Sequence, residues 1–217
     1  MIRELHFPTP IYMFDIKDQS LNIQLEKDIL NWMNQDKGVS RTNVKGWHSH
    51  TNMHTKPEFA KLTKALHEAQ FKIYKEENLD SEPFLGNMWA NVHPPGGFNR
   101  AHLHPNCLWS GVYYVKTPEK CGDLKLKDPR TGAEMLMPKM IERFNHPNTA
   151  PTRLWREVHY EPIAGRCIMF PAWLIHGVDP NNSNDIRISV SFNFLQKGMF
   201  VWLKLFIKNY PLIKFHI

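Results

Sequence analysis

The first third of the chain contains two stretches whose apolar residues recur every three or four positions. In the first stretch these residues are Leu21, Leu25, Ile29 and Met33. In the second they are Phe59, Leu62, Leu66, Ala69 and Ile73. Ser20 suits an N-cap and Gly38 a stop for the first helix, and Pro57 suits the first turn of the second. Both predicted helices are amphipathic, so we expect each to cover one face of another layer.

After Pro83 the pattern changes to short runs that are rich in β-branched and aromatic residues. These runs are NMWANV, WSGVYYV, DLKLKD, REVHYEPI, RCIMFPAW and RISVSFNF. Segments rich in proline, glycine and asparagine separate them, which is typical of strands joined by turns. Helices followed by many short strands predict a mainly β protein, either a β-sandwich or a jelly roll, with the helices on one side.

The length of 217 residues suits a single domain. We expect this domain to occupy residues 1–197, with a helical part over about 1–80, and a basic, apolar tail over 198–217. The tail pattern fits a helix at a membrane surface or a strand, and we expect it to dock on the same fold or on a second subunit in a homodimer. Residues 132–153 show little apolar alternation, which predicts a long insertion or lid.

The composition limits the class of protein. Hydrophobic residues make up 42% and charged residues 22%, which excludes a disordered or membrane-spanning chain. The formal net charge is +6, but the tail from residue 197 onwards carries four lysines and no acid, so nucleic acid is not the expected partner. Three cysteines without a C-x-x-C pair, and an N-terminus without an apolar signal core, favour a cytoplasmic protein.

Candidate chemistry begins in the segment NRAHLHPNCLWSGVYYV, residues 99–115. His102 and His104 are two positions apart, so on an extended chain their side chains point to the same side. Imidazole is a ligand for iron, zinc, copper and nickel, which makes this pair a candidate metal site. A hydrogen-bonded histidine pair that stabilises a strand and turn is the alternative.

A third histidine and a buried cation follow in the last strands. His176 lies at the end of the apolar run MFPAWLIH, before a Gly-Val-Asp-Pro turn, where a ligand can project from the rim of a barrel. Arg187 and Ser189 share one face of the run RISVSFNF. A buried guanidinium needs an anionic partner, which a bound carboxylate would provide. An ion pair with Asp179 or Asp185 is the alternative.

This order of motifs resembles the iron(II)- and 2-oxoglutarate-dependent oxygenases. The similarity is to a bacterial and phage subfamily that is prolyl-hydroxylase-like, through the segments GGFNRAHLHPNCLWSGVYYV, DPR, FPAWLIHGV and RISVSFNF. The resemblance implies a double-stranded β-helix (jelly-roll) core flanked by the N-terminal helices. It further implies an enzyme, an Fe(II) dioxygenase that uses 2-oxoglutarate and O2 to hydroxylate a small-molecule or peptidyl substrate and releases succinate and CO2.

The resemblance also implies roles for single residues. His102 and His176 match metal ligands, Arg187 with Ser189 matches the clamp on the far carboxylate of 2-oxoglutarate, and Tyr114 matches a tyrosine that contacts the same carboxylate. His104 stands where the family has an aspartate or glutamate. Three neutral imidazoles could favour zinc or a non-catalytic, cupin-like metal-binding protein. The pI of 9.2 keeps a nucleic-acid-modifying oxygenase as a further alternative.

Some residues are candidates for the substrate pocket by position alone. They are Asn91, Arg100, Trp173 and Asn193. The cluster of His48, His50 and His54 is expected in an exposed loop, with the mouth of the active site as the alternative. A Pro-Pro-Gly-Gly turn separates His93 from the first motif, and we therefore place His93 outside the metal site.

Overall fold

The computed structural model describes residues 2, 7–130 and 157–197, and the structural statements below concern these residues. The expected lid at 132–153 and the tail at 198–217 lie outside the described residues. Within the described ranges, no helix is long and apolar enough to cross a membrane. Cys107, Cys121 and Cys167 are free thiols.

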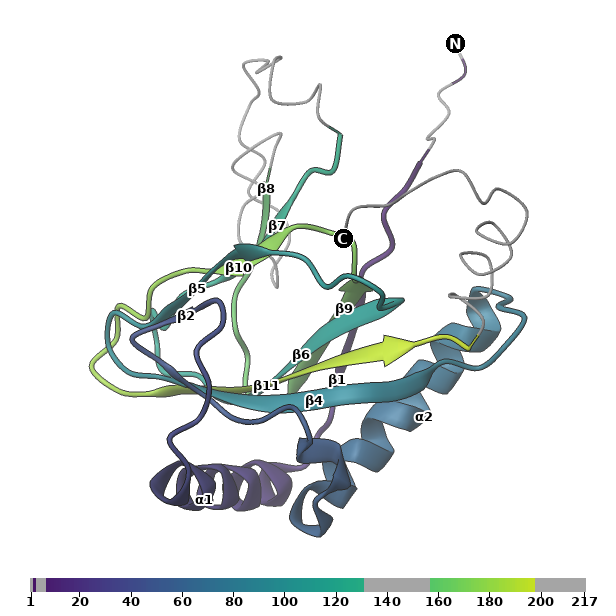
Figure 1. Cartoon of the computed structure of the whole chain (residues 1–217). Helices are drawn as coiled ribbons and strands as arrows, with labels where there is room; N and C mark the ends of the chain where they lie inside the picture. The colour runs from purple at the N-terminus through teal and green to yellow at the C-terminus, as the bar shows by residue number, and fades with distance from the viewer. Residues whose placement is uncertain (1, 3–6, 131–156, 198–217) are drawn as a thin grey trace, which may run out of the picture.

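The strands form two antiparallel sheets, one above the other in Figure 1. The larger sheet has the order β1 (Tyr12–Asp15), β9 (Arg166–Pro171), β6 (Trp109–Lys116), β11 (Arg187–Leu195), β4 (Phe84–His93) and β3 (Trp47–His48). The smaller sheet has the order β2 (Asn43–Val44), β5 (Phe98–His102), β10 (His176–Val178), β7 (Leu124–Lys127) and β8 (Glu157–Tyr160). Late strands pair with early ones in both sheets, and the arrangement confirms a mainly β, jelly-roll fold with two helices.

Both predicted helices are present, and both lie against the outer face of the larger sheet (Figure 1). They are α1 (Gln19–Gln35) and α2 (Ala60–Glu76), and the short 3-10 turns η1 (Met53–Thr55) and η2 (Pro57–Phe59) precede α2. The expected N-cap was wrong: Asp18, not Ser20, accepts a hydrogen bond from the backbone N–H of Leu21 at 3.0 Å. A carboxylate at this position also interacts favourably with the helix dipole.

Alternation along β11 divides the larger sheet into an apolar and a polar face. The apolar residues are Ile188, Val190, Phe192 and Phe194, all fully buried in the core under the helices. Their partners in this core include Leu25 and Ile29 of α1 and Leu62 and Leu66 of α2. Fully burying one such side chain stabilises the fold by about 1.5–3 kcal/mol. The residues between them face the other sheet, and they form one wall of the candidate site.

Candidate metal centre and its cavity

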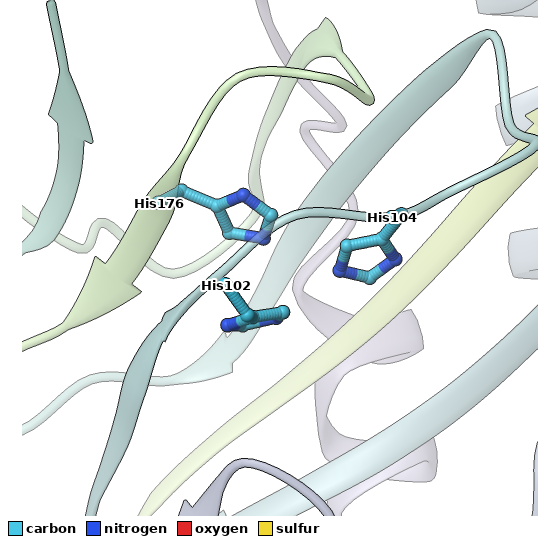
Figure 2. A group of neighbouring side chains, drawn as sticks. All are labelled: His102, His104 and His176. Atoms are coloured by element: carbon cyan, nitrogen blue, oxygen red, sulfur yellow. The ribbon is translucent and has the colours of Figure 1, made fainter.

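Three histidines converge between the two sheets. His102 ends β5 and is the register partner of His176, which begins β10. His104 follows the strand, and its backbone N–H donates to Ala172 O at 2.9 Å. Figure 2 shows the three rings pointing toward one another. The ring centroids are 4.3 Å apart for His102 and His176, and 5.0 Å apart for the other two pairs.

These imidazoles fit a single metal ion. One ring nitrogen from each histidine lies within 4.8 Å of the corresponding atoms of the other two. Nδ1 of His102 is 2.7 Å from Arg100 O and Nδ1 of His176 is 2.9 Å from Leu174 O. Since a carbonyl can only accept, both Nδ1 atoms carry the proton, and both Nε2 lone pairs are left for a metal. Nε2 of His104 is buried and has no hydrogen-bond partner among the described residues.

Burial keeps the three histidines uncharged. Desolvation lowers the pKa of His176 to about 3 and the pKa of His104 to about 4, and it lowers the pKa of His102 in the same direction. The positive charge that His102 would carry contributes to the lower pKa of the other two. A neutral imidazole is the form that binds metal, so no proton competes at neutral pH.

His104 is held by stacking instead of a hydrogen bond to a carbonyl. Its ring lies against Trp89, with the centroids 5.6 Å apart and the planes inclined by 17°. Trp89 in turn stacks on His48, with a centroid distance of 5.4 Å and an angle of 11°. The three rings form a continuous stack that connects β3 and β4 to the metal site.

The described residues place no carboxylate in the three-histidine group. A second group, made of Asp123, His159 and Asp179, also has ligand atoms within 4.8 Å of one another. Lys125 already pairs with Asp179 there, with Nζ 2.8 Å from Oδ1. The second group is therefore an ion-pair network that contains its own cation, and the three histidines are the better metal site.

A cavity of about 340 Å³ opens beside the three histidines. Its polar wall consists of inward-facing residues of β4 and β11: Asn87, Trp89, Asn91, His93, Arg187, Ser189, Ser191 and Asn193. Apolar side chains from β6, β7, β9 and β10 also line it: Val112, Leu124, Phe170 and Val178. A pocket with an apolar lining and a few convergent polar groups is typical of a small-molecule site.

Arg187 lies at one end of this wall and is 1% exposed. Its Nη1 donates to three backbone carbonyls: to Cys121 O, to Gly122 O at 3.1 Å and to Asp179 O at 3.2 Å. Its Nη2 is buried without a partner in the described part of the chain. An ion pair with the Asp179 or Asp185 carboxylate does not form, because Lys125 and Lys116 pair with these two acids. The guanidinium is thus anchored on one side and available to an anion on the other.

Tyr114 and Ser189 are register partners on β6 and β11, and both line the cavity. Tyr114 is 2% exposed, and burial raises the pKa of its phenol, while the charge of Arg187 opposes this shift. The phenol therefore stays protonated at neutral pH and can donate a hydrogen bond. Asn91, the partner of Ser189 on β4, also lines the cavity, so Tyr114, Ser189 and Asn91 form one row across three strands.

Two of the four pocket candidates lie elsewhere. Asn91 and Asn193 line the cavity, but Arg100 and Trp173 do not, and Trp173 is 53% exposed. The reason for Arg100 is a bulge: His102 pairs with His176 and Asn99 pairs with Val178, so four residues of β5 lie opposite three of β10. The bulge interrupts the alternation, and Arg100 does not face the cavity with His102. Trp173 lies beyond Pro171, where β9 ends, so strand alternation does not extend to it.

Other residues of the site were missed or misplaced. His48 was expected in an exposed loop but is 5% exposed and lines the cavity. His93 also lines it, opposite Arg187 in the register of β4 and β11, and neither ring nitrogen has a partner among the described residues. Trp89 was overlooked. Since Asn91 was already a candidate, the two-residue alternation along NMWANVH could have identified both Trp89 and His93.

The expected position of His176 at the end of the preceding apolar strand is wrong. That strand, β9, ends at Pro171, and His176 is the first residue of β10.

Comparison with known proteins agrees with this geometry. Residues 87–193 match the family described as "Putative 2OG-Fe(II) oxygenase". This range contains the three histidines, Tyr114 and Arg187. This part of the chain is therefore an oxygenase domain of the 2OG-Fe(II) class, whose cofactors are Fe(II) and 2-oxoglutarate. No curated protein matches the chain.

Solved structures share the fold at low sequence identity. A prolyl-4-hydroxylase from Pseudomonas putida has a TM-score of 0.63 at 16% identity, covering 87% of this chain and 93% of its own. A prolyl hydroxylase from Trichoplax adhaerens, in complex with a peptide fragment of the hypoxia inducible factor oxygen degradation domain, has a TM-score of 0.59 at 13% identity, covering 86% and 84%. The non-heme alpha ketoglutarate dependent epimerase SnoN from nogalamycin biosynthesis has a TM-score of 0.61 at 12% identity, covering 86% and 78%.

Proposed function

We propose that this oxygenase is a hydroxylase that converts a C–H bond of a small molecule or a peptidyl side chain into C–OH. One atom of O2 enters the product, the other enters succinate, and 2-oxoglutarate loses CO2. The observation that carries the proposal is Nη2 of buried Arg187, which has no partner among the described residues and lines the same cavity as the three converging imidazoles. A carboxylate anchor and a metal site in one cavity are what 2-oxoglutarate requires.

The histidines would hold Fe(II) through Nε2 of His102, Nε2 of His176 and a ring nitrogen of His104. Bound iron supplies the activation of O2 that the organic side chains cannot provide. Three neutral ligands leave the full positive charge on the ion, which favours the binding of an anionic co-substrate. The edge of His176 lies against Phe170, with the centroids 4.7 Å apart, which shields this imidazole from water.

Arg187 would orient the co-substrate by its far carboxylate. Three carbonyls fix Nη1, so Nη2 keeps one direction and no side-chain entropy is lost when the anion binds. The Tyr114 hydroxyl and the Ser189 hydroxyl would donate to the same carboxylate. The apolar residues Val112, Leu124 and Phe170 restrict water around this end of the cavity and strengthen these charge-assisted bonds.

The test is an anaerobic titration of the metal-free protein with Fe(II) and then 2-oxoglutarate, followed by the weak visible charge-transfer band of the chelate. We expect the band in the wild type. Arg187→Ala should weaken 2-oxoglutarate binding on the order of 100-fold without loss of Fe(II), because a buried charge-assisted hydrogen bond from Nη2 is removed. His176→Ala should lose Fe(II) itself.

Among the described residues no carboxylate joins the three histidines, which favours one second candidate, a non-catalytic cupin-like metal-binding protein. Tight zinc binding by the wild type, with no 2-oxoglutarate band and no effect of Arg187→Ala, would support that alternative and contradict the hydroxylase.

A further inference from the structure

The charges on the cavity wall are all of one sign. Its lining contains two charged side chains, Arg187 and Arg41, and no aspartate or glutamate among the described residues. A cleft lined by one sign of charge attracts ligands of the opposite sign.

The two arginines have different positions. Arg187 is deep in the cavity and nearly without solvent access, as the anchor for 2-oxoglutarate requires. Arg41 is exposed, in the segment that leads into β2, so it lies at the mouth of the cavity. Its charge contributes to the low pKa of His48, which places the guanidinium near the ring stack of His48 and Trp89.

The guanidinium of Arg41 is free for a ligand. Its backbone N–H donates to Asn43 Oδ1 at 2.7 Å, which fixes the start of the turn. In the described part of the chain, the side chain has neither an ion pair nor a hydrogen bond.

The space and the neutral polar groups limit the rest of the substrate. A volume of about 340 Å³ is near the lower end for ligand pockets, and the co-substrate must share it. At the end of β11 away from Arg187, Asn193 accepts from Ser110 Oγ at 2.6 Å and donates to Asn87 Oδ1 at 2.7 Å. These amides and hydroxyls offer hydrogen bonds without charge.

We propose that the substrate of this oxygenase is a small molecule with an anionic group, a carboxylate or a phosphate, which Arg41 binds at the mouth of the cavity. The proposal rests on the proposed function, since it assigns Arg187 to the co-substrate and leaves Arg41 for the substrate. Arg41 is then a specificity-determining residue, and a neutral analogue of the substrate leaves its charge unpaired.

The test compares matched charged and neutral probes on protein loaded with Zn(II) and saturating 2-oxoglutarate, which fills Arg187 and prevents turnover. The probes are N-acetyl amino acids against their C-terminal amides, and glycerol 3-phosphate against glycerol, with binding followed by ligand-observed NMR. In at least one pair, we expect the charged probe to bind at least about 10-fold more tightly than its neutral counterpart. This is the gain in affinity expected from one charge-assisted hydrogen-bonded pair. The pair that shows the preference distinguishes carboxylate from phosphate.

Arg41→Gln should abolish this preference and leave the affinity for 2-oxoglutarate unchanged. Lys37→Gln is the matched control, because it removes one exposed positive charge from the same segment without touching the cavity. The proposal is overturned if charged and neutral probes bind equally, or if Lys37→Gln reduces the preference as much as Arg41→Gln. Failure of the wild type to bind 2-oxoglutarate, measured first in the same samples, would instead contradict the proposed function.

Discussion

Trp89 lies flat against His104, with the ring centroids 5.6 Å apart and the planes inclined by 17°. His102 and His176 are each oriented by a carbonyl that accepts from Nδ1. The ring of His104 instead lies in this stack, next to His176 and with a side-chain hydrogen bond to Asn193. Groups that orient metal ligands contribute to metal affinity although they do not touch the ion. Trp89 is therefore a positioning residue for His104.

Replacing Trp89 by leucine should weaken metal binding about 10-fold, the lower end of the range for residues that orient ligands. Trp89→Phe keeps an aromatic face and should retain most of the affinity. The measurement is competition for Zn(II) or Co(II) against a chelator of known affinity. Trp109→Phe is the control, because Trp109 is also buried on the larger sheet but packs edge-on against Tyr12, outside the site. Equal affinities for Trp89→Leu and the wild type would show that the stack does not position His104.

The substitution His104→Asp tests whether His104 is a metal ligand, at the position where the resemblance implies an aspartate or glutamate. His104→Ala should lower the affinity for Zn(II) at least about 10-fold, since two histidine ligands remain. His104→Asp supplies a carboxylate oxygen at the same position and should recover part of that loss. The same competition assay measures both. If His104→Ala binds metal as tightly as the wild type, His104 is not a ligand, and the site has two protein ligands.

The helices and the two faces of the larger sheet could be predicted because local pattern determines them. Leu21, Leu25 and Ile29 are buried as the four-residue spacing indicates, and Arg187 and Ser189 share the cavity face of β11 as the two-residue period requires. These inferences need only the periods of a helix and a strand. The same period indicates that His102 and His104 lie on one side of the chain, but their convergence with His176 comes from the pairing of β5 with β10.

The remaining errors come from features that a local period does not contain. The bulge between β5 and β10 turns Arg100 out of the cavity, and it depends on how two distant strands pair. His48 is buried because β3 pairs with the distant strand β4, in a register that places His48 opposite Asn91. Pairing between distant segments is a tertiary property. The polar cluster around His48 therefore resembled an exposed loop in the sequence alone.

The core under the larger sheet makes a direct prediction about stability. Leu25 on α1 is completely buried, whereas Ile23 on the same helix is 64% exposed. Leu25→Ala should lower the free energy of unfolding by about 2–5 kcal/mol, because a cavity remains where the side chain was. Ile23→Ala should change it by no more than about 0.5 kcal/mol. Urea denaturation measures both, and similar losses for the two variants would contradict the packing of α1 on the sheet.

His93 should make the stability of the protein depend on pH. Burial, and secondly the positive charge of Arg187, lower its pKa from the ordinary 6.5 to about 3. The unfolded chain therefore binds a proton near pH 6.5 that the folded protein does not bind until about pH 3. The contribution of neutral His93 to stability is complete above pH 6.5 and is lost progressively as the pH falls toward 3. Between about pH 7.5 and about pH 5.5, this loss amounts to about 1.4 kcal/mol.

His93→Leu removes the titrating group and fills its place with an apolar side chain. The free energy of unfolding, measured by urea denaturation at both pH values, should fall more in the wild type than in the variant, by about 1.4 kcal/mol. Other buried histidines contribute equally to both proteins, so the difference isolates His93. An identical fall in the two proteins would mean that His93 titrates normally in the folded state and is not enclosed beside Arg187.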